Sequence, residues 1–303
     1  MAAQFQRVGL VARRSRHIPA VDRGVVDSVR QVAEVLLAQG VAVTLEARTA
    51  EAMPLAGADV HAREDLGDHC DLIVVVGGDG SILGVGRDLA AARVPVIGIN
   101  RGGLGFLAGI AADVMATKLI EVLHGDYVSE DHFLLEARVL REGVELSCSP
   151  AMNDVVVHPG TMARMMEFSL WVDDKFVYEQ RSDGLIIASP TGSTAYALSA
   201  GGPIMHPSLD ALVIVPMFPH TLTSRPLVVG GGSRLRIVIG DRGELSAQAS
   251  CDGQVHHPFT SGDELHVAKY AHPLKLLYPR DHSFYESCRS KLDWATRLGG
   301  RQV

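Results

Sequence analysis

The feature that most constrains the fold is a change of hydrophobic pattern near residue 130. Before it, short runs such as 71–76 and 94–99 are apolar throughout and alternate with segments of helical spacing. Such runs are typical of a parallel sheet covered by helices on both faces. After it, apolar and polar residues alternate, as in 135–139 and 168–172. This alternation is typical of antiparallel strands. The sequence therefore predicts an α/β domain followed by a β-rich domain.

We place the α/β domain, with its parallel sheet, at residues 1–129, the β-rich domain at 130–278 and a helical tail at 279–303. Apolar residues recur at helical spacing in the tail, at Phe284, Cys288, Leu292 and Ala295. A helix with one apolar face must cover apolar surface, so we expect the tail to pack back on the first domain. Gly299 and Gly300 are predicted to end this helix.

Charge and cysteine content exclude several classes of protein. The formal net charge of −7 argues against a nucleic-acid binder, which needs a basic face. Four cysteines lie far apart without a Cys-x-x-Cys pair, which is typical of free thiols in a reducing compartment. The chain shows no secretory signal and no apolar run of membrane-spanning length. We therefore expect a cytoplasmic protein without a membrane partner.

The segment 77–81 reads Gly-Gly-Asp-Gly-Ser, between an apolar strand and a helical run. Glycines allow a sharp turn, and a helix start offers free N–H groups that suit phosphate. The predicted phosphate loop consists of Gly77, Gly78, Gly80 and Ser81, with Ser81 as the helix N-cap. A carboxylate fits this setting if it faces a hydroxyl that must lose a proton, so Asp79 is the candidate general base. The alternative is a tight turn in which Asp79 is only a local cap.

Two further segments carry polar groups suited to a nucleotide. Asn153 and Asp154 begin a strand and could hold a ribose diol, although a capped strand edge explains the same pair. The segment 188–196 reads Ala-Ser-Pro-Thr-Gly-Ser-Thr-Ala-Tyr and opens a short helix. Its hydroxyl and backbone groups could donate to phosphate or to an adenine edge, with Arg181 as a nearby cation. The alternative is a polar connection between two strands.

Other candidate motifs are interpreted as structural. The segment 103–108 reads Gly-Leu-Gly-Phe-Leu-Ala and is the nearest approach to a dinucleotide fingerprint. The chain contains no Walker A lysine motif. Its 13 histidines are scattered without metal-ligand spacing, so we predict no metal ligands from the protein itself.

The order of these motifs resembles that of NAD kinases, and the compact length resembles the bacterial forms. Gly-Gly-Asp-Gly is followed by Leu-Gly-Phe-Leu at 104–107, Asn-Asp at 153–154, Asp-Gly at 183–184 and Ser-Pro-Thr-Gly-Ser-Thr-Ala-Tyr at 189–196. The resemblance runs from Arg7 to about Trp294. The stretch at 189–196 is highly specific, whereas lipid kinases and phosphofructokinases share Gly-Gly-Asp-Gly.

The resemblance implies a β-sandwich-like second domain and a role for particular residues. Asp79 would be the proton acceptor, with Gly80 beside the substrate, and Asn153 and Asp154 would hold the substrate ribose. Family members commonly carry Glu at the second position of that pair, so Asp154 is one methylene shorter. Further NAD contacts are implied for Arg164, Arg181, Asp183, Thr194, Ala195, Tyr196, Ala197, Leu198, Ser199 and Gln254.

The implied reaction moves a terminal phosphoryl group from ATP or polyphosphate to the 2′-hydroxyl of the adenosine ribose of NAD. Mg²⁺ would bridge the donor phosphates. The family works as homo-oligomers whose subunits share sites, which implies a homodimer or homotetramer. Two alternatives stay open: a lipid or sugar kinase with the same loop, and a non-catalytic NAD(P)-binding sensor. The stretch at 189–196 counts against the first, and the presence of Asp79 counts against the second.

Overall fold

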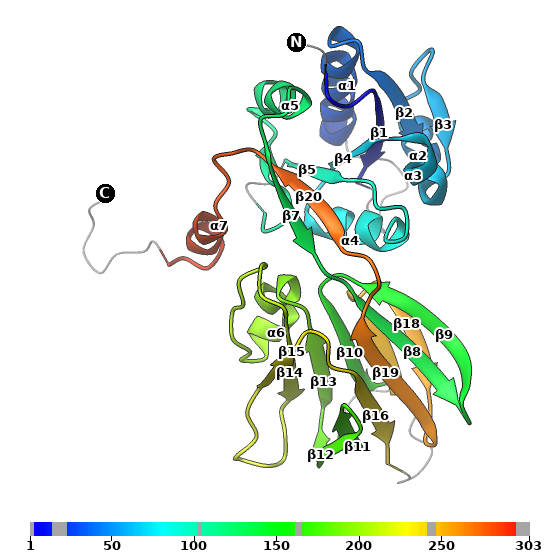
Figure 1. Ribbon diagram of the computed structural model, residues 1–303, viewed down its shortest axis with the longest axis vertical. Helices are drawn as coiled ribbons and strands as arrows, with labels where there is room; N and C mark the ends of the chain where they lie inside the picture. The colour runs from blue at the N-terminus through cyan, green and yellow to red at the C-terminus, as the bar shows by residue number, and fades with distance from the viewer. Residues whose placement is uncertain (1–2, 14–22, 102–104, 161–164, 241–246, 295–303) are drawn as a thin grey trace. The chain divides into compact units, whose positions relative to one another are not determined.

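The computed structural model describes residues 3–13, 23–101, 105–160, 165–240 and 247–294 (Figure 1). The chain forms two compact units, Met1–Asp131 with Leu274–Val303, and His132–Pro273. The expected boundary after residue 278 differs from this division, because Leu274–Tyr278 is a strand of the first unit. That strand is apolar at four of its five positions and pairs in parallel with a buried strand of the first sheet, so it belongs to the α/β core.

The sheet of the first unit has eight strands in the order β3-β2-β1-β4-β5-β20-β7, with β6 beside β5. Strands β1 to β6 and β20 pair in parallel, as the continuous apolar runs predicted. The strands are β1 (Arg7–Ala12), β2 (Ala42–Glu46), β3 (Asp59–His61), β4 (Leu72–Val76), β5 (Val96–Asn100), β6 (Ile110–Ala111), β7 (Val128–His132) and β20 (Leu274–Tyr278).

The first unit also contains helices (Figure 1). They are α1 (Arg23–Ala38), α2 (Ala47–Ala52), the 3₁₀ helix η1 (Arg63–Asp65), α3 (Leu66–His69), α4 (Asp79–Asp88), α5 (Met115–Leu123) and α7 (Phe284–Lys291). Helix α1 buries Val25, Val29, Val32 and Leu36, whose spacing places them on one face. Each such side chain contributes roughly 1.5–3 kcal/mol of stability on burial. Helices α1 and α5 pack together over one common core with the strands.

The C-terminal helix is shorter than predicted, because α7 ends at Lys291, with Leu292 as its C-cap. Ala295, Gly299 and Gly300 lie outside the described residues. The helix belongs to the first unit, and the ring of Phe284 lies 6.3 Å from that of Phe106, centroid to centroid.

The second unit consists of two six-stranded antiparallel sheets, in the orders β15-β14-β13-β10-β17-β18 and β12-β11-β16-β19-β8-β9. Apolar residues of both sheets form one core, so the predicted sandwich is confirmed. The strands are β8 (Leu135–Arg141), β9 (Val144–Ala151), β10 (Asp154–Pro159), β11 (Met166–Val172), β12 (Lys175–Ser182), β13 (Gly184–Ala188), β14 (Ala211–Met217), β15 (Leu227–Gly230), β16 (Leu235–Ile239), β17 (Ala247–Cys251), β18 (Val255–Phe259) and β19 (Asp263–Lys269). A 3₁₀ helix η2 (Thr191–Thr194) and a short helix α6 (Tyr196–Ser199) follow β13.

Candidate active site

The glycine-rich segment joins β4 to α4, and Asp79 is the first residue of that helix. Gly78 is the N-cap, in extended conformation, so the prediction that Ser81 caps the helix is wrong. The chain enters the helix earlier than expected, which leaves Ser81 inside the first turn. A side chain at Gly77 would lie 2.5 Å from Ser81 Oγ, so this turn requires glycine there. Gly80 is exposed.

The carboxylate of Asp79 accepts three backbone hydrogen bonds from a loop that follows β5. Phe106 N–H donates to Oδ2 at 2.9 Å, and Leu107 N–H and Ala108 N–H donate to Oδ1 at 3.2 and 3.1 Å. We call these three N–H groups the amide cradle. The N-cap of α4 is Gly78 and not Asp79, and the Asp79 side chain binds a separate loop, so the alternative of a local helix cap is not what the structure contains.

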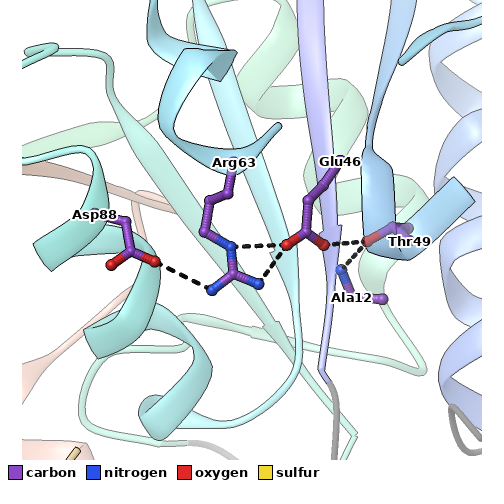
Figure 2. A network of polar contacts seen from close by, with 5 residues as sticks. All are labelled: Ala12, Glu46, Thr49, Arg63 and Asp88. Carbon is purple, nitrogen blue, oxygen red and sulfur yellow. Dashed lines mark hydrogen bonds and ion pairs between the residues drawn. The ribbon is translucent and has the colours of Figure 1, made fainter. Parts of the chain in front are cut away.

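A polar network anchors the other end of α4 (Figure 2). Arg63 donates to Glu46 Oε1 at 2.8 and 2.5 Å and lies 3.4 Å from Asp88, the last residue of α4. Thr49 Oγ1 donates to Glu46 Oε2 at 2.7 Å and accepts from Ala12 N–H at 2.9 Å. Glu46 is only 2% exposed, and a buried charge of this kind needs such partners. The network thus connects α4 with the ends of β1 and β2.

The second unit contains a cavity of about 550 Å³. Four of the predicted site residues line it: Asn153, Asp154, Ala195 and Tyr196. Its other lining residues are Val156, His158, Met217, Ser250, Asp252 and Gly253. The cavity therefore brings the Asn-Asp pair and the end of the 188–196 segment together, although Ala195 comes 41 positions after Asp154 in the sequence.

The remaining predicted contacts lie elsewhere in the second unit. Tyr196 and Ser199 line a neighbouring cavity of about 340 Å³. Ala197 is fully buried, and Arg181 and Asp183 are exposed near the end of β12. Thr194 and Leu198 are half-buried, as is Gln254 in the turn after β17. Arg164 lies outside the described residues, as do Gly103 and Leu104.

Four hydroxyl groups of the 188–196 segment, those of Ser189, Thr191, Ser193 and Thr194, have partners inside the protein. Ser189 Oγ donates to Met152 C=O at 2.6 Å, and Ser193 Oγ donates to Pro190 C=O at 2.6 Å. Thr191 Oγ1 lies 2.9 Å from His132 Nδ1, and Thr194 Oγ1 donates to Thr191 C=O at 3.1 Å. Buried hydroxyls need partners, and nearby groups of the protein supply them before any ligand arrives.

This segment packs directly on the Asn-Asp pair. Ser189 N–H donates to Asn153 C=O at 2.9 Å. A Cβ atom at Gly192 would lie 2.0 Å from the same Asn153 oxygen, so only glycine fits. The segment therefore acts as a support that sets the position of Asn153.

Asp252 is a cavity residue to which the sequence analysis assigned no role. Its carboxylate accepts from the N–H groups of Met152, Asn153 and Asp154 at 3.0, 2.7 and 3.3 Å. Its own N–H donates to Asp154 C=O at 3.0 Å, and its φ of +52° is left-handed. An Asp-Gly pair directly after a strand marks such a turn and was the available signal.

The carboxyl of Asp154 is buried, with 4% of the residue exposed. Burial, and after it the charge of Asp252, raise the pKa of Asp154 to about 7. Near neutral pH this group can therefore be a carboxylic acid, which donates a hydrogen bond, or a carboxylate, which only accepts.

Comparison with known proteins shows the family of this chain. Residues 8–127 match the ATP-NAD kinase N-terminal domain family, and residues 152–278 match the ATP-NAD kinase C-terminal domain family. The chain is 51% identical over 297 residues to an NAD kinase of Ectopseudomonas mendocina, covering 98% of this chain and 99% of that protein. It is 50% identical over 296 residues to an NAD kinase of Azotobacter vinelandii, covering 98% of each.

Two solved structures share the fold over both units. Yeast NADH kinase complexed with NADH has a TM-score of 0.83 at 25% identity, covering 97% of this chain and 90% of that one. An NAD kinase from Archaeoglobus fulgidus in complex with ATP has a TM-score of 0.73 at 25% identity, covering 95% and 99%. Fold, glycine loop and relatives together define a phosphotransferase. The chain belongs to the NAD kinase family, and neither a lipid or sugar kinase nor a non-catalytic sensor is favoured.

Within the described ranges, no helix combines the length and the apolar character needed to span a membrane. No group of three or more His, Cys, Asp or Glu side chains within those ranges is placed to hold a metal ion.

Proposed function

We propose that this protein transfers the terminal phosphoryl group of ATP to the 2′-hydroxyl of the adenosine ribose of NAD, giving NADP and ADP. The observation that carries the proposal is the carboxylate of Asp79, which begins α4 directly after the glycine loop and is held by the amide cradle. A carboxylate fixed in this way is a general base with a defined direction.

In the proposed step the 2′-oxygen attacks the terminal phosphorus and forms the new P–O bond. The bond from that phosphorus to the bridging oxygen breaks, and ADP leaves with the electron pair. The hydroxyl proton passes to Asp79 Oδ2, which accepts one hydrogen bond from the cradle where Oδ1 accepts two. Proton acceptance of this kind is typically worth about 10²- to 10⁴-fold in rate.

The other residues bind and orient the substrates. We place the donor phosphates at the turn formed by Gly77, Gly78, Gly80 and Ser81, where the start of α4 favours negative charge. The N–H groups of Gly77 and Ser81 hold this turn, because they donate to Ile99 C=O and Gly78 C=O, each at 2.9 Å. Mg²⁺, when present, is carried by the donor phosphates and neutralises their charge, and we assign it no protein ligand. In the cavity of the second unit, we assign Asn153 and Asp154 to the ribose, and Ala195 and Tyr196 to the adenosine. The other residues of 194–199 belong to the same proposed adenosine end without lining this cavity.

Arg164, Arg181, Asp183 and Gln254 complete the proposed NAD contacts. Arg181 and Asp183 do not line the cavity of their own unit. We assign them to a site shared between subunits of a homodimer or homotetramer. A cytoplasmic location is part of the same proposal.

The test is a coupled assay of NADP formation with purified protein. We expect turnover with ATP and NAD, and none with diacylglycerol or fructose 6-phosphate as acceptor. The same assay is repeated with polyphosphate in place of ATP as the phosphoryl donor. Absence of NADP formation with both donors, despite NAD binding, would contradict the proposal and favour a sensor.

A further inference from the structure

The amide cradle is an arrangement of consecutive N–H groups that converge on one side chain. Phe106, Leu107 and Ala108 lie 27 to 29 residues after Asp79 in the sequence, yet all three donate to its carboxylate. A carboxylate offers about four acceptor positions on its two oxygens. Two cradle bonds reach Oδ1 and one reaches Oδ2, so the second position on Oδ2 is left for another donor.

Gly105 makes this close approach possible. A Cβ atom on this residue would lie 2.1 Å from Asp79 Oδ1 and 2.8 Å from its Cγ. Cβ atoms essentially never come within 3.0 Å of heavy atoms beyond their own and the adjacent residues, so any side chain here would move the carboxylate or the turn. The glycine is required for space, and not for an unusual backbone conformation, because its φ is not in the left-handed region.

The turn rests on packed neighbours within the first unit. A Cβ atom at Gly98 would lie 2.3 Å from Ile82 of α4 and 2.9 Å from the Cα of Ala108. A Cβ atom at Gly109 would lie 2.5 Å from the ring of Tyr278, which is 1% exposed. These close contacts leave the cradle little freedom to shift, so the direction of the carboxylate is set by the fold.

We propose that Gly105 and the amide cradle form a positioning element, which turns the free acceptor position of Asp79 toward the hydroxyl that is phosphorylated. This inference rests on the proposed role of Asp79 as the base. The positioning of a reacting group before the substrate arrives avoids the cost of ordering it during the reaction. Gly105 is therefore a positioning residue, which acts through Asp79.

The main test is Gly105→Ala in the wild-type and Asp79→Asn backgrounds. In the wild-type background we expect kcat to fall about 10- to 100-fold, with the KM for NAD changed less than about 3-fold. In the Asp79→Asn background the same substitution is expected to change the residual kcat less than about 2-fold, because the group that it positions is already disabled. Gly232→Ala is the matched control, since Gly232 is exposed with open space around it, and it should change neither parameter.

An equal loss of kcat in both backgrounds would show that Gly105 acts independently of Asp79 and would overturn the inference. If Asp79→Asn retains wild-type turnover, the base assignment fails, which is a separate result. Amide hydrogen exchange provides a measurement that needs no substitution at Gly105. Asp79→Ala should reduce the protection of the N–H groups of Phe106, Leu107 and Ala108, and unchanged protection at all three would also overturn the inference.

Discussion

Two aspartates, one in each unit, use the same set of contacts for different purposes. Asp79 follows β4 and Asp252 follows β17, and each precedes a glycine. Each carboxylate accepts three hydrogen bonds from consecutive backbone N–H groups, at 106–108 for Asp79 and at 152–154 for Asp252. In the first unit the loop positions the carboxylate. In the second, the carboxylate positions a loop whose residues line a cavity.

The difference shows that an Asp-Gly pair after a strand does not by itself identify a candidate general base. Asp252 has a left-handed backbone and faces a second, buried carboxyl, that of Asp154. Asp79 begins a helix after a glycine loop. The setting of each carboxylate therefore assigns the role, and the following substitutions test that assignment.

The largest expected effect is that of Asp79→Asn on turnover. The amide can no longer take the proton, so kcat should fall by about 10²- to 10⁴-fold while NAD still binds. Steady-state kinetics and calorimetric titration with NAD measure the two quantities. Asp59→Asn, at an exposed position of β3, is the matched control and should leave both unchanged. Near wild-type turnover in Asp79→Asn would remove the distinction between the two aspartates.

The corresponding change in the second unit, Asp252→Ala, should act on binding more than on chemistry. It leaves three N–H groups without their acceptor beside the cavity, and each lost bond to a charged group costs about 1.5–3 kcal/mol. We expect the KM for NAD to rise at least about 10-fold, together with a lower midpoint of thermal unfolding. Glu179→Ala, at an exposed position of β12, controls for loss of a surface charge. A selective fall in kcat would instead place Asp252 among the catalytic groups.

A smaller effect is expected from Gly192→Ala, which tests the support of Asn153 from the opposite side. The added methyl group would meet the Asn153 carbonyl at 2.0 Å, so the backbone must shift. Overpacking of this kind typically costs about 1–3 kcal/mol. Chemical denaturation and NAD titration of this variant, with Gly232→Ala beside it, check the effect. Equal stability of the two variants would contradict it.

The last expected effect concerns stability and not turnover, and it is a pH dependence due to Asp154. Folding raises the pKa of Asp154 from 3.8 to about 7, so between these values the folded protein binds more protons than the unfolded chain. Its contribution to the free energy of unfolding is fully present below about pH 4 and is lost as the pH rises toward 7. The slope is at most about 1.4 kcal/mol per pH unit.

Asp154→Asn removes this titration. The difference in free energy of unfolding between the variant and the wild type should therefore grow in favour of the variant from pH 5 to pH 7, and then become constant. Urea denaturation at four pH values measures it. Parallel stability curves for the two proteins would show that Asp154 titrates alike in the folded and unfolded states.

Hydrophobic periodicity alone predicted much of the fold. Continuous apolar runs predicted the parallel sheet, and alternation predicted the sandwich, because these periods reflect which faces a strand buries. The strand Leu274–Tyr278 was assigned to the second domain, whereas it lies in the first unit. A pattern of five residues does not identify the sheet that a strand joins. Local pattern also placed the helix N-cap at Ser81, whereas the glycine turn starts α4 at Asp79.

The sequence by itself determined the two-part architecture, the glycine loop with its carboxylate, and the motifs that assign the family. Only the tertiary structure decided what those side chains do. It turned the hydroxyls of Ser189 and Ser193 inward, gave Asp252 its role, and joined Gly105 to Asp79. The physical reason is that these contacts join residues as far as 100 positions apart. A local sequence pattern carries no information about such pairs.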